Sequence, residues 1–234
     1  FVQRPRLTAR INEGVRGPLT LLSAPAGFGK TQLLAEWAAE GAHAIAWLTL
    51  GAEDNDYTRF FRYLSSAFQE VEPRLSDAIL DYLQTTESSR LEMATLLINE
   101  VSAIPKHFVL VVDEYHVLEN PSIITDLNFL LNNLPPNLHL IIASRSEQSL
   151  DLAILRAKGQ VTEIGADELR LTHEEVIEFC DQTMRLQLPP EAIRTLEERT
   201  EGWVVGLQLA ALSLRNRADT SELLRGIQGD THYL

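Results

Sequence analysis

Five short apolar runs alternate along the chain with longer stretches in which apolar residues recur every three or four positions. The runs cover residues 19–23, 44–49, 107–112, 138–143 and 161–164. A short, continuously apolar run predicts a strand buried on both faces, and strands that alternate with helical stretches are typical of a parallel sheet. We therefore predict an α/β fold of three layers (α/β/α), in which helices cover both faces of a five-stranded parallel sheet.

An aromatic stripe lies between the second and third runs. Its members Tyr57, Phe60, Phe61, Leu64 and Phe68 fall at helical spacing. Residues three and four positions apart share one face of a helix. We interpret the stripe as core that packs against the sheet, not as an aromatic binding platform.

Two further helix starts are indicated by capping boxes, in which Ser or Thr is followed three residues later by Glu. Ser89 and Glu92 form one box and predict a helix through about residue 103. Thr172 and Glu175 form the other and predict a helix through about residue 183.

The strand pattern ends near residue 165, and only helical patterns follow it. Residues 201–203, Glu-Gly-Trp, interrupt these helices before an apolar run over 204–214. Because that run is apolar on almost every side, we expect it to be buried between other elements. We predict a sheet-containing domain over residues 1–165 and an all-α helical subdomain over residues 166–234.

Composition narrows the function classes. A formal net charge of −13 over 234 residues argues against a nucleic-acid-binding surface, because phosphate contacts need a basic face. Cys180 is the only cysteine, which excludes a disulfide framework and a thiolate zinc site and fits a reducing, cytoplasmic compartment. No apolar stretch approaches the roughly 20 residues that span a bilayer, so no membrane association is expected. The first residue, Phe1, and the last, Leu234, suggest a piece of a longer protein.

The strongest chemical signal is the loop after the first predicted strand. Residues 24–31 read Ala-Pro-Ala-Gly-Phe-Gly-Lys-Thr, and a helical stretch follows them. A strand, a glycine-containing turn and Lys-Thr at the start of a helix form the phosphate-binding P-loop, GxxxxGK[ST]. Gly27 and Gly29 allow the backbone N–H groups to converge on phosphates, and the helix N-terminus adds its positive dipole end.

Individual side chains of this loop have separate expected roles. Lys30 supplies a positive charge for the β- and γ-phosphates, and the Thr31 hydroxyl is a ligand for Mg²⁺. Ala24 stands where the pattern has its first glycine, which argues against a left-handed backbone at residue 24 but leaves the cradle intact. The alternative is an ordinary glycine-rich turn with a solvated lysine. The predicted nucleotide-binding residues of the loop are Ala26, Gly27, Phe28, Gly29, Lys30, Thr31 and Gln32.

A second half of a nucleotide site is predicted where the third strand ends in Asp113 and Glu114. Ligands bind at the carboxyl ends of parallel strands. Asp113 would hold Mg²⁺ opposite Thr31, and Glu114 would activate water for attack on the γ-phosphate. The alternative is an exposed acidic turn.

Arginine and histidine side chains add weaker candidates. Arg145 follows the fourth strand and would point toward the γ-phosphate, although it could instead pair with Glu147 on the surface. Arg156 is expected on a solvated helix face. His116 is the only histidine near the predicted chemistry and is interpreted as a loop residue, because the six histidines lack metal-ligand spacing. The predicted catalytic set is Glu114, Lys30 and Arg145.

With these residues in place, the chain resembles the nucleotide-binding domain of the STAND class of P-loop NTPases. Within that class it is similar to the ATP-dependent, LuxR-type large transcriptional activators, the MalT-like group. The resemblance covers essentially all 234 residues. It rests on the blocks Arg4–Leu7, Ser23–Thr31, Glu36–Trp37, Trp47–Leu50, Asp54–Asp56, Val112–His116, Ser144–Arg145, Thr200–Trp203 and Gly206–Ala210.

The resemblance implies further site residues. The segment from Val2 to Arg4 would lie beside the adenine. The block that starts at Gly206 resembles the Gly-Leu-Pro motif that closes over the nucleotide in related switches, but here Gln208 replaces the proline. Plain helix packing is the alternative for this block, and core packing is the alternative for Trp203.

The resemblance also implies a function. In this family the nucleotide state controls an activating, often oligomerising, switch, while a superhelical sensor domain and a DNA-binding helix-turn-helix lie elsewhere in the protein. We therefore expect an ATP-binding signal-transduction switch that hydrolyses ATP slowly, uses ATP/ADP and Mg²⁺, self-associates in a nucleotide-dependent way and does not itself bind DNA. The alternative is a productive P-loop ATPase or phosphotransferase, in which turnover is the function.

Overall fold

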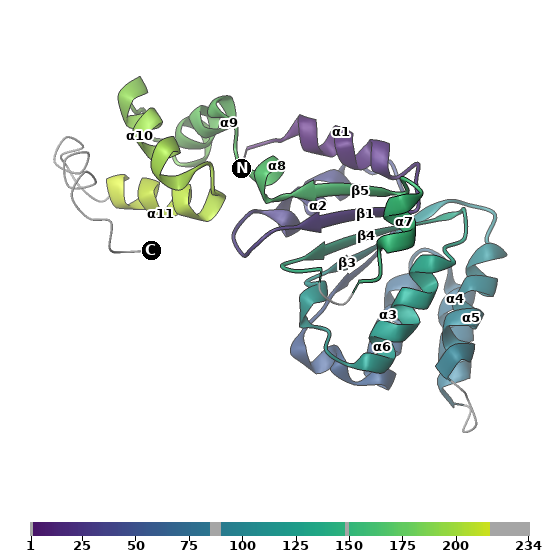
Figure 1. The fold of residues 1–234 in the computed structure, drawn as a ribbon. Helices are drawn as coiled ribbons and strands as arrows, with labels where there is room; N and C mark the ends of the chain where they lie inside the picture. The colour runs from purple at the N-terminus through teal and green to yellow at the C-terminus, as the bar shows by residue number, and fades with distance from the viewer. Residues whose placement is uncertain (1, 85–89, 148–149, 216–234) are drawn as a thin grey trace. The chain divides into compact units, whose positions relative to one another are not determined.

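The computed structural model describes residues 2–84, 90–147 and 150–215 (Figure 1). By their contacts these residues form two compact units. The sheet unit comprises residues 6–25 and 30–165, and the helical unit comprises the described parts of residues 1–5, 26–29 and 166–234. That residues 1–165 and 166–234 fold as separate domains stays a prediction.

All five predicted strands are present in the sheet unit and are parallel, which confirms the α/β prediction. Their order in the sheet is β2-β3-β4-β1-β5. The central strands β3 and β4 are buried along their whole length, as expected for strands covered on both faces. The strands are β1 (Leu19–Ser23), β2 (Ile45–Thr49), β3 (Phe108–Asp113), β4 (Leu138–Ser144) and β5 (Val161–Gly165).

One face of the sheet carries the main hydrophobic core. Alternate strand residues such as Leu110 and Val112 pack there with side chains of the helices that follow β2 and β3. The prediction that the aromatic stripe packs in the core is confirmed, because Phe60, Phe61 and Phe68 are buried there. The helices of this layer are α3 (Tyr57–Gln69), α4 (Pro73–Gln84), α5 (Arg90–Ser102) and α6 (Pro121–Asn132), and Figure 1 shows them grouped together. The capping box predicted at Ser89 lies outside the described residues.

Helix α1 (Pro5–Gly14) packs against the opposite face of the sheet, beside α2 (Lys30–Ala39). A Cβ atom built on Gly14 would lie 2.3 Å from Thr20 Oγ1, so only glycine lets α1 approach β1 this closely. Trp37 of α2 is buried, and its indole N–H donates to Asn12 Oδ1 of α1 over 2.7 Å. A short helix, α7 (Ala153–Ala157), precedes β5.

Between residues 166 and 215, the part of the helical unit's C-terminal segment that the structure describes, the regular elements are all helices, as predicted. They are α8 (Ala166–Leu169), α9 (His173–Glu178), the π-helical turn η3 (Phe179–Thr183), α10 (Pro190–Thr200) and α11 (Val204–Arg215). The second capping box is confirmed: Thr172 Oγ1 accepts from Glu175 N, and Glu175 Oε2 accepts from Thr172 N over 3.0 Å. Glu201 and Gly202 separate α10 from α11, because their left-handed φ angles of 48° and 72° cannot continue a helix.

Helix α11 differs from its prediction. Leu207, Ala211 and Leu214 are buried, but Leu209 is 57% exposed. The buried residues are four and three positions apart, so they line one face of the helix. The expectation of burial on every side is wrong for the described residues, because only this one face packs in the core of the helical unit.

None of the helices in the described residues combines the length and the apolar character of a membrane span.

Candidate nucleotide-binding site

The loop between β1 and α2 has the backbone that its glycines predict. Gly27 and Gly29 have left-handed φ angles of 80° and 76°, whereas Ala24 has no positive φ. The Ala24 N–H donates to Ser144 O over 3.3 Å, which ties the start of the loop to the end of β4. Alanine at position 24 is therefore compatible with the cradle.

Lys30 begins α2 and is 6% exposed. Its ammonium donates to two carbonyls of its own loop, Ala24 O at 2.6 Å and Pro25 O at 3.0 Å. Burial is the largest influence on the Lys30 pKa and lowers it from its ordinary value, while the carboxylate of Glu114 is the largest opposing influence. An ammonium held at the start of α2 by two loop carbonyls is suited to neutralise a phosphate group bound by the same loop.

The other predicted loop residues differ in exposure. Phe28 is buried, Gly27 and Gly29 are half-buried, and Ala26, Thr31 and Gln32 are exposed. Thr31 is thus accessible from the solvent, as a magnesium ligand must be.

Within the helical unit, the tip of this loop is bound through its carbonyl oxygens. The Trp203 indole N–H donates to Ala26 O over 3.2 Å, and Val205 N donates to Gly27 O over 3.3 Å. The buried Arg4 donates to Gly29 O over 3.0 Å and to Leu169 O over 3.3 Å.

The structure also places the residues that the resemblance singled out. Val2 is buried in the core of the helical unit, and Gly206 lies against the ring of Trp203, which a Cβ at residue 206 would meet at 2.7 Å. Gln208 is exposed. Trp203 is only half-buried and contacts the P-loop, so it does more than fill the core. Roles of Val2, Arg4 and Gly206 in binding adenine stay predictions.

Asp113 ends β3 and is fully buried. Its Oδ1 accepts from Glu114 N over 2.9 Å, but its Oδ2 has no hydrogen-bond partner among the described residues. A buried carboxylate oxygen is costly unless a cation or a donor satisfies it. Asp113 therefore fits the predicted magnesium ligand, and it lies in register with Thr49 at the end of β2.

Glu114 has an unusual backbone. Its φ of 57° and ψ of 33° are left-handed, which is uncommon outside glycine, and it precedes the short helix η2 (Tyr115–Val117). Glu114 Oε2 lies 3.4 Å from Arg145 Nη2 and 3.4 Å from His116 Nε2. The structure thus brings all three predicted catalytic side chains into one electrostatic cluster, because Glu114 and Arg145 both act on the pKa of Lys30.

Arg145 is exposed, as the alternative expects, but its ion pair among the described residues is with Glu114 and not with Glu147. Glu147 is 2.5 Å from Arg156 instead, and Arg156 also binds Glu163 at 2.6 Å. These two carboxylates raise the pKa of Arg156 through hydrogen bonds. Arg156 therefore lies on a solvated surface, as expected, and is occupied by acidic neighbours.

His116 lies in the short helix η2 and not in a loop, and it contacts Glu114 of the acidic pair. Burial is the main cause that lowers its pKa from the ordinary value. The described residues include no cluster of three or more His, Cys, Asp or Glu side chains able to hold a metal ion. Asp113 and Thr31 would thus need phosphate and water oxygens to complete a magnesium shell, as is usual for this ion.

No protein-family model matches the chain. The chain is 36% identical over 217 residues to the HTH-type transcriptional regulator MalT of Cronobacter sakazakii, covering 92% of this chain and 24% of that protein. It is 34% identical over 234 residues to the serine/threonine-protein kinase PknK of Mycobacterium tuberculosis, covering 98% of this chain and 21% of that kinase. A solved STAND protein with a tetratricopeptide repeat sensor from Pyrococcus horikoshii shares its fold, with a TM-score of 0.65 and 19% identity over 99% of this chain and 33% of that one.

The chain is a MalT-like STAND P-loop NTPase domain. It spans about a fifth to a quarter of the length of the curated relatives it matches. The resemblance drawn from the sequence motifs is thereby confirmed.

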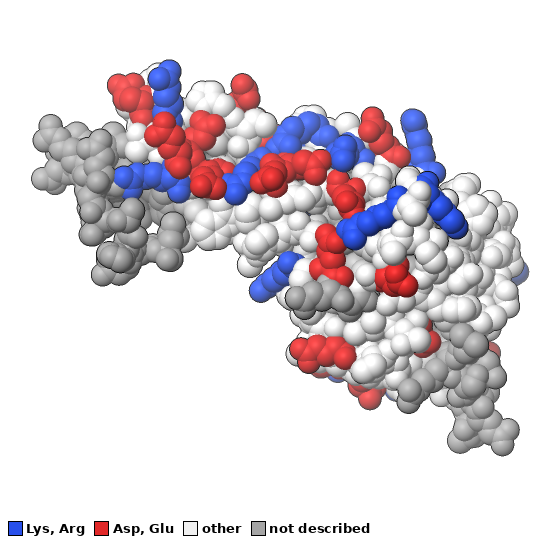
Figure 2. Space-filling model, in the orientation of Figure 1, with Lys and Arg blue, Asp and Glu red and all other residues white. Residues whose placement is uncertain are grey.

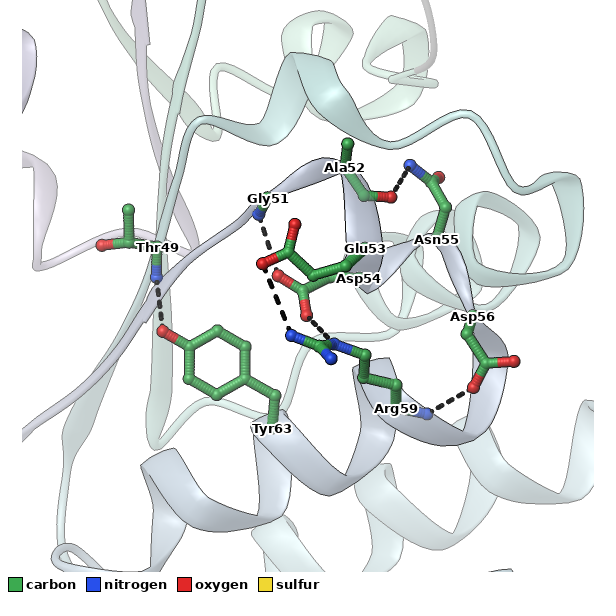
Figure 3. A network of polar contacts seen from close by, with 9 residues as sticks. All are labelled: Thr49, Gly51, Ala52, Glu53, Asp54, Asn55, Asp56, Arg59 and Tyr63. Carbon is green, nitrogen blue, oxygen red and sulfur yellow. Dashed lines mark hydrogen bonds and ion pairs between the residues drawn. The ribbon is translucent and has the colours of Figure 1, made fainter.

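One feature of this MalT-like domain was missed by sequence reasoning. The Asp54-Asn55-Asp56 block contributed to the resemblance without an assigned role. In the structure it forms a polar network at the carboxyl end of β2 (Figure 3). A run of three short polar residues a few positions after β2 was the available signal, because such residues commonly bind backbone groups in turns.

Proposed function

We propose that this domain is an ATP-binding switch of a transcriptional regulator that hydrolyses ATP slowly. The observation that carries the proposal is the convergence of Lys30, Asp113, Glu114 and Arg145 beside a P-loop with left-handed glycines. Because the relatives are much longer than this chain, the activity of the whole protein is part of the proposal.

The loop backbone and Lys30 bind the phosphates. The N–H groups of the loop and the N-terminus of α2 provide neutral donors, and Lys30 exchanges its contacts with Ala24 O and Pro25 O for phosphate oxygens. The carbonyl oxygens of Ala26, Gly27 and Gly29 are bound elsewhere, which favours an orientation of the loop with its N–H groups facing the ligand.

Thr31 and Asp113 hold Mg²⁺ in this proposal, since one offers an exposed hydroxyl and the other an unsatisfied buried carboxylate oxygen. When bound, the ion neutralises charge that develops on the phosphate oxygens. Glu114 orients and deprotonates the attacking water, and Arg145 stabilises negative charge at the γ-phosphate.

The switch follows from differential binding. If one arrangement of the domain binds ATP better than ADP, hydrolysis and exchange shift the population between arrangements. We propose that this shift controls activation and self-association of the full-length protein, and that a sensor domain and a DNA-binding helix-turn-helix lie elsewhere in it. The 21–24% coverage of the relatives supports additional domains.

Nucleotide turnover separates this proposal from the alternative. A switch retains nucleotide and hydrolyses it far more slowly than the common kcat range of about 1–1000 per second, whereas a productive ATPase or phosphotransferase operates within that range. Single-turnover hydrolysis of bound ATP and gel filtration with ATP and with ADP test the proposal. Turnover in the productive range with an unchanged elution volume would contradict it.

A further inference from the structure

Asn55 joins two loops at the carboxyl edge of the sheet. Its side-chain N–H₂ donates to Ala52 O at 3.2 Å, seen in Figure 3, and to Val117 O at 2.7 Å. Its Oδ1 accepts from Glu119 N at 2.6 Å and from Asn120 N at 3.0 Å, and its own backbone carbonyl accepts from Asn120 Nδ2 at 2.7 Å. One amide side chain therefore binds the loop after β2 to the segment that follows the acidic end of β3.

Asp54 and Asp56, the two neighbours of Asn55, bind groups within residues 51–59. Asp54 is buried and accepts from Gly51 N at 2.8 Å and Arg59 Nε at 3.0 Å, and Asp56 accepts from Arg59 N at 2.8 Å as the cap of α3 (Figure 3). Both aspartates thus bind only groups of their own segment in this network. They fix the backbone on either side of Asn55. The Asn55 side chain is therefore oriented by its own segment toward the segment that follows β3.

The segment that Asn55 binds begins at Glu114. Val117 N donates to Glu114 O over 3.1 Å, and the carbonyl of the same Val117 is the one that Asn55 binds. At its other end the segment is anchored by Asp113, which is buried in β3 and whose carbonyl accepts from Leu50 N over 3.0 Å. A non-glycine residue keeps a left-handed backbone only when its surroundings over-determine it. Glu114 meets this condition because both sides of it are anchored.

We propose that Asn55 is a positioning residue for ATP hydrolysis. By binding Val117, Glu119 and Asn120 it holds the left-handed turn that presents the Glu114 carboxylate beside Arg145. Asparagine suits this role because one side chain offers both two donors and an acceptor, whereas aspartate lacks the donors and alanine lacks both. The inference rests on the proposed function, and it assigns to Asn55 a part in the chemical step and none in phosphate binding.

The test compares Asn55→Ala, Glu114→Gln and the double variant in the whole chain. MgATP affinity is measured by calorimetry, and hydrolysis of prebound ATP is measured in single turnover. We expect Asn55→Ala to lower the hydrolysis rate about ten-fold or more, since small misplacements of catalytic groups carry penalties of this order. The affinity should stay within about two-fold, and the double variant should hydrolyse ATP no more slowly than Glu114→Gln alone, as expected for residues that act as one unit.

Asn133→Ala is the matched control. Asn133 is an exposed asparagine at the far end of α6 that donates to Phe129 O, so its removal should leave rate and affinity unchanged. Circular dichroism and thermal unfolding establish that each variant is folded. A wild-type rate in folded Asn55→Ala, a parallel loss of affinity, or multiplied effects in the double variant would overturn the inference. A wild-type chain that binds no nucleotide would instead contradict the proposed function, and the inference with it.

Discussion

Arg145 Nη2 lies 3.4 Å from Glu114 Oε2, at the carboxyl ends of the neighbouring strands β3 and β4. The pair is half-exposed, so it contributes little to the free energy of unfolding. Its consequence is that Glu114 orients the Arg145 guanidinium. We expect Arg145→Ala to slow hydrolysis about ten-fold or more, because a fixed positive charge near the γ-phosphate stabilises the transition state. Single-turnover rates measure the effect. Arg156→Ala is the control, because Arg156 is bound to Glu147 and Glu163 on the surface, and an equal slowing in both variants would contradict the assignment.

Lys30→Ala should weaken ATP and ADP binding severely, by about a hundred-fold or more, because the backbone N–H groups alone cannot balance the phosphate charge. Calorimetry with each nucleotide provides the measurement. Lys158→Ala removes an exposed lysine at the end of α7 and should bind like the wild type. Unchanged affinity in a folded Lys30→Ala variant would refute the P-loop assignment.

Substitutions of the two carboxylates at the end of β3 should affect different steps, nucleotide binding for Asp113 and hydrolysis for Glu114. Asp113→Ala should lose the dependence of ATP binding on Mg²⁺, because the buried Oδ2 is then absent. Glu114→Gln should bind MgATP normally but hydrolyse it more slowly, because the role of Glu114 is realised in the transition state. Nucleotide titrations with Mg²⁺ and with a chelator distinguish the two cases. Equal losses of affinity would contradict this division.

His139 should make stability depend on pH. It is buried in β4, where Nδ1 lies 2.7 Å from Gly17 O and Nε2 lies 3.0 Å from Thr20 Oγ1. Burial is the main cause that lowers its pKa to about 4. The unfolded chain therefore takes up a proton first as the pH falls below about 6.5, and stability is lost between that pH and about 4.

Between pH 7 and pH 5 we expect His139 to lower the free energy of unfolding by about 2 kcal/mol. Denaturant unfolding at both pH values measures it. In His139→Gln this part of the pH dependence should disappear, because the titrating group is gone. A variant that loses as much stability as the wild type over this range would show that other groups are responsible.

The chain alone should not bind DNA with sequence specificity. Its 33 acidic residues outnumber 20 basic ones, and Figure 2 shows acidic and basic side chains interspersed over the described part of one face. DNA readout needs a continuous basic surface to contact phosphates. A gel-shift assay at physiological salt is decisive: tight, sequence-specific retardation by residues 1–234 would overturn this prediction.

Local sequence patterns were sufficient to predict the strands, the P-loop and the capping box at Thr172. Each strand was predicted within one or two residues, because a strand covered on both faces must be continuously apolar. The P-loop was equally readable, since the left-handed turns at Gly27 and Gly29 and the charge of Lys30 depend on residue types that are adjacent in the chain. The capping box at Thr172 is local for the same reason.

Contacts between distant segments were decided only by tertiary structure. The sequence alone left Arg145 with two partners to choose from, and it assigned no role to Asn55. The parallel order of β3 and β4 brings Arg145 beside Glu114, and packing of α3 and α6 on one sheet face brings Asn55 to Val117, 62 positions away in the chain. A side-chain hydrogen bond depends on positions in space to within a few tenths of an ångström, and only the packed fold sets positions that finely.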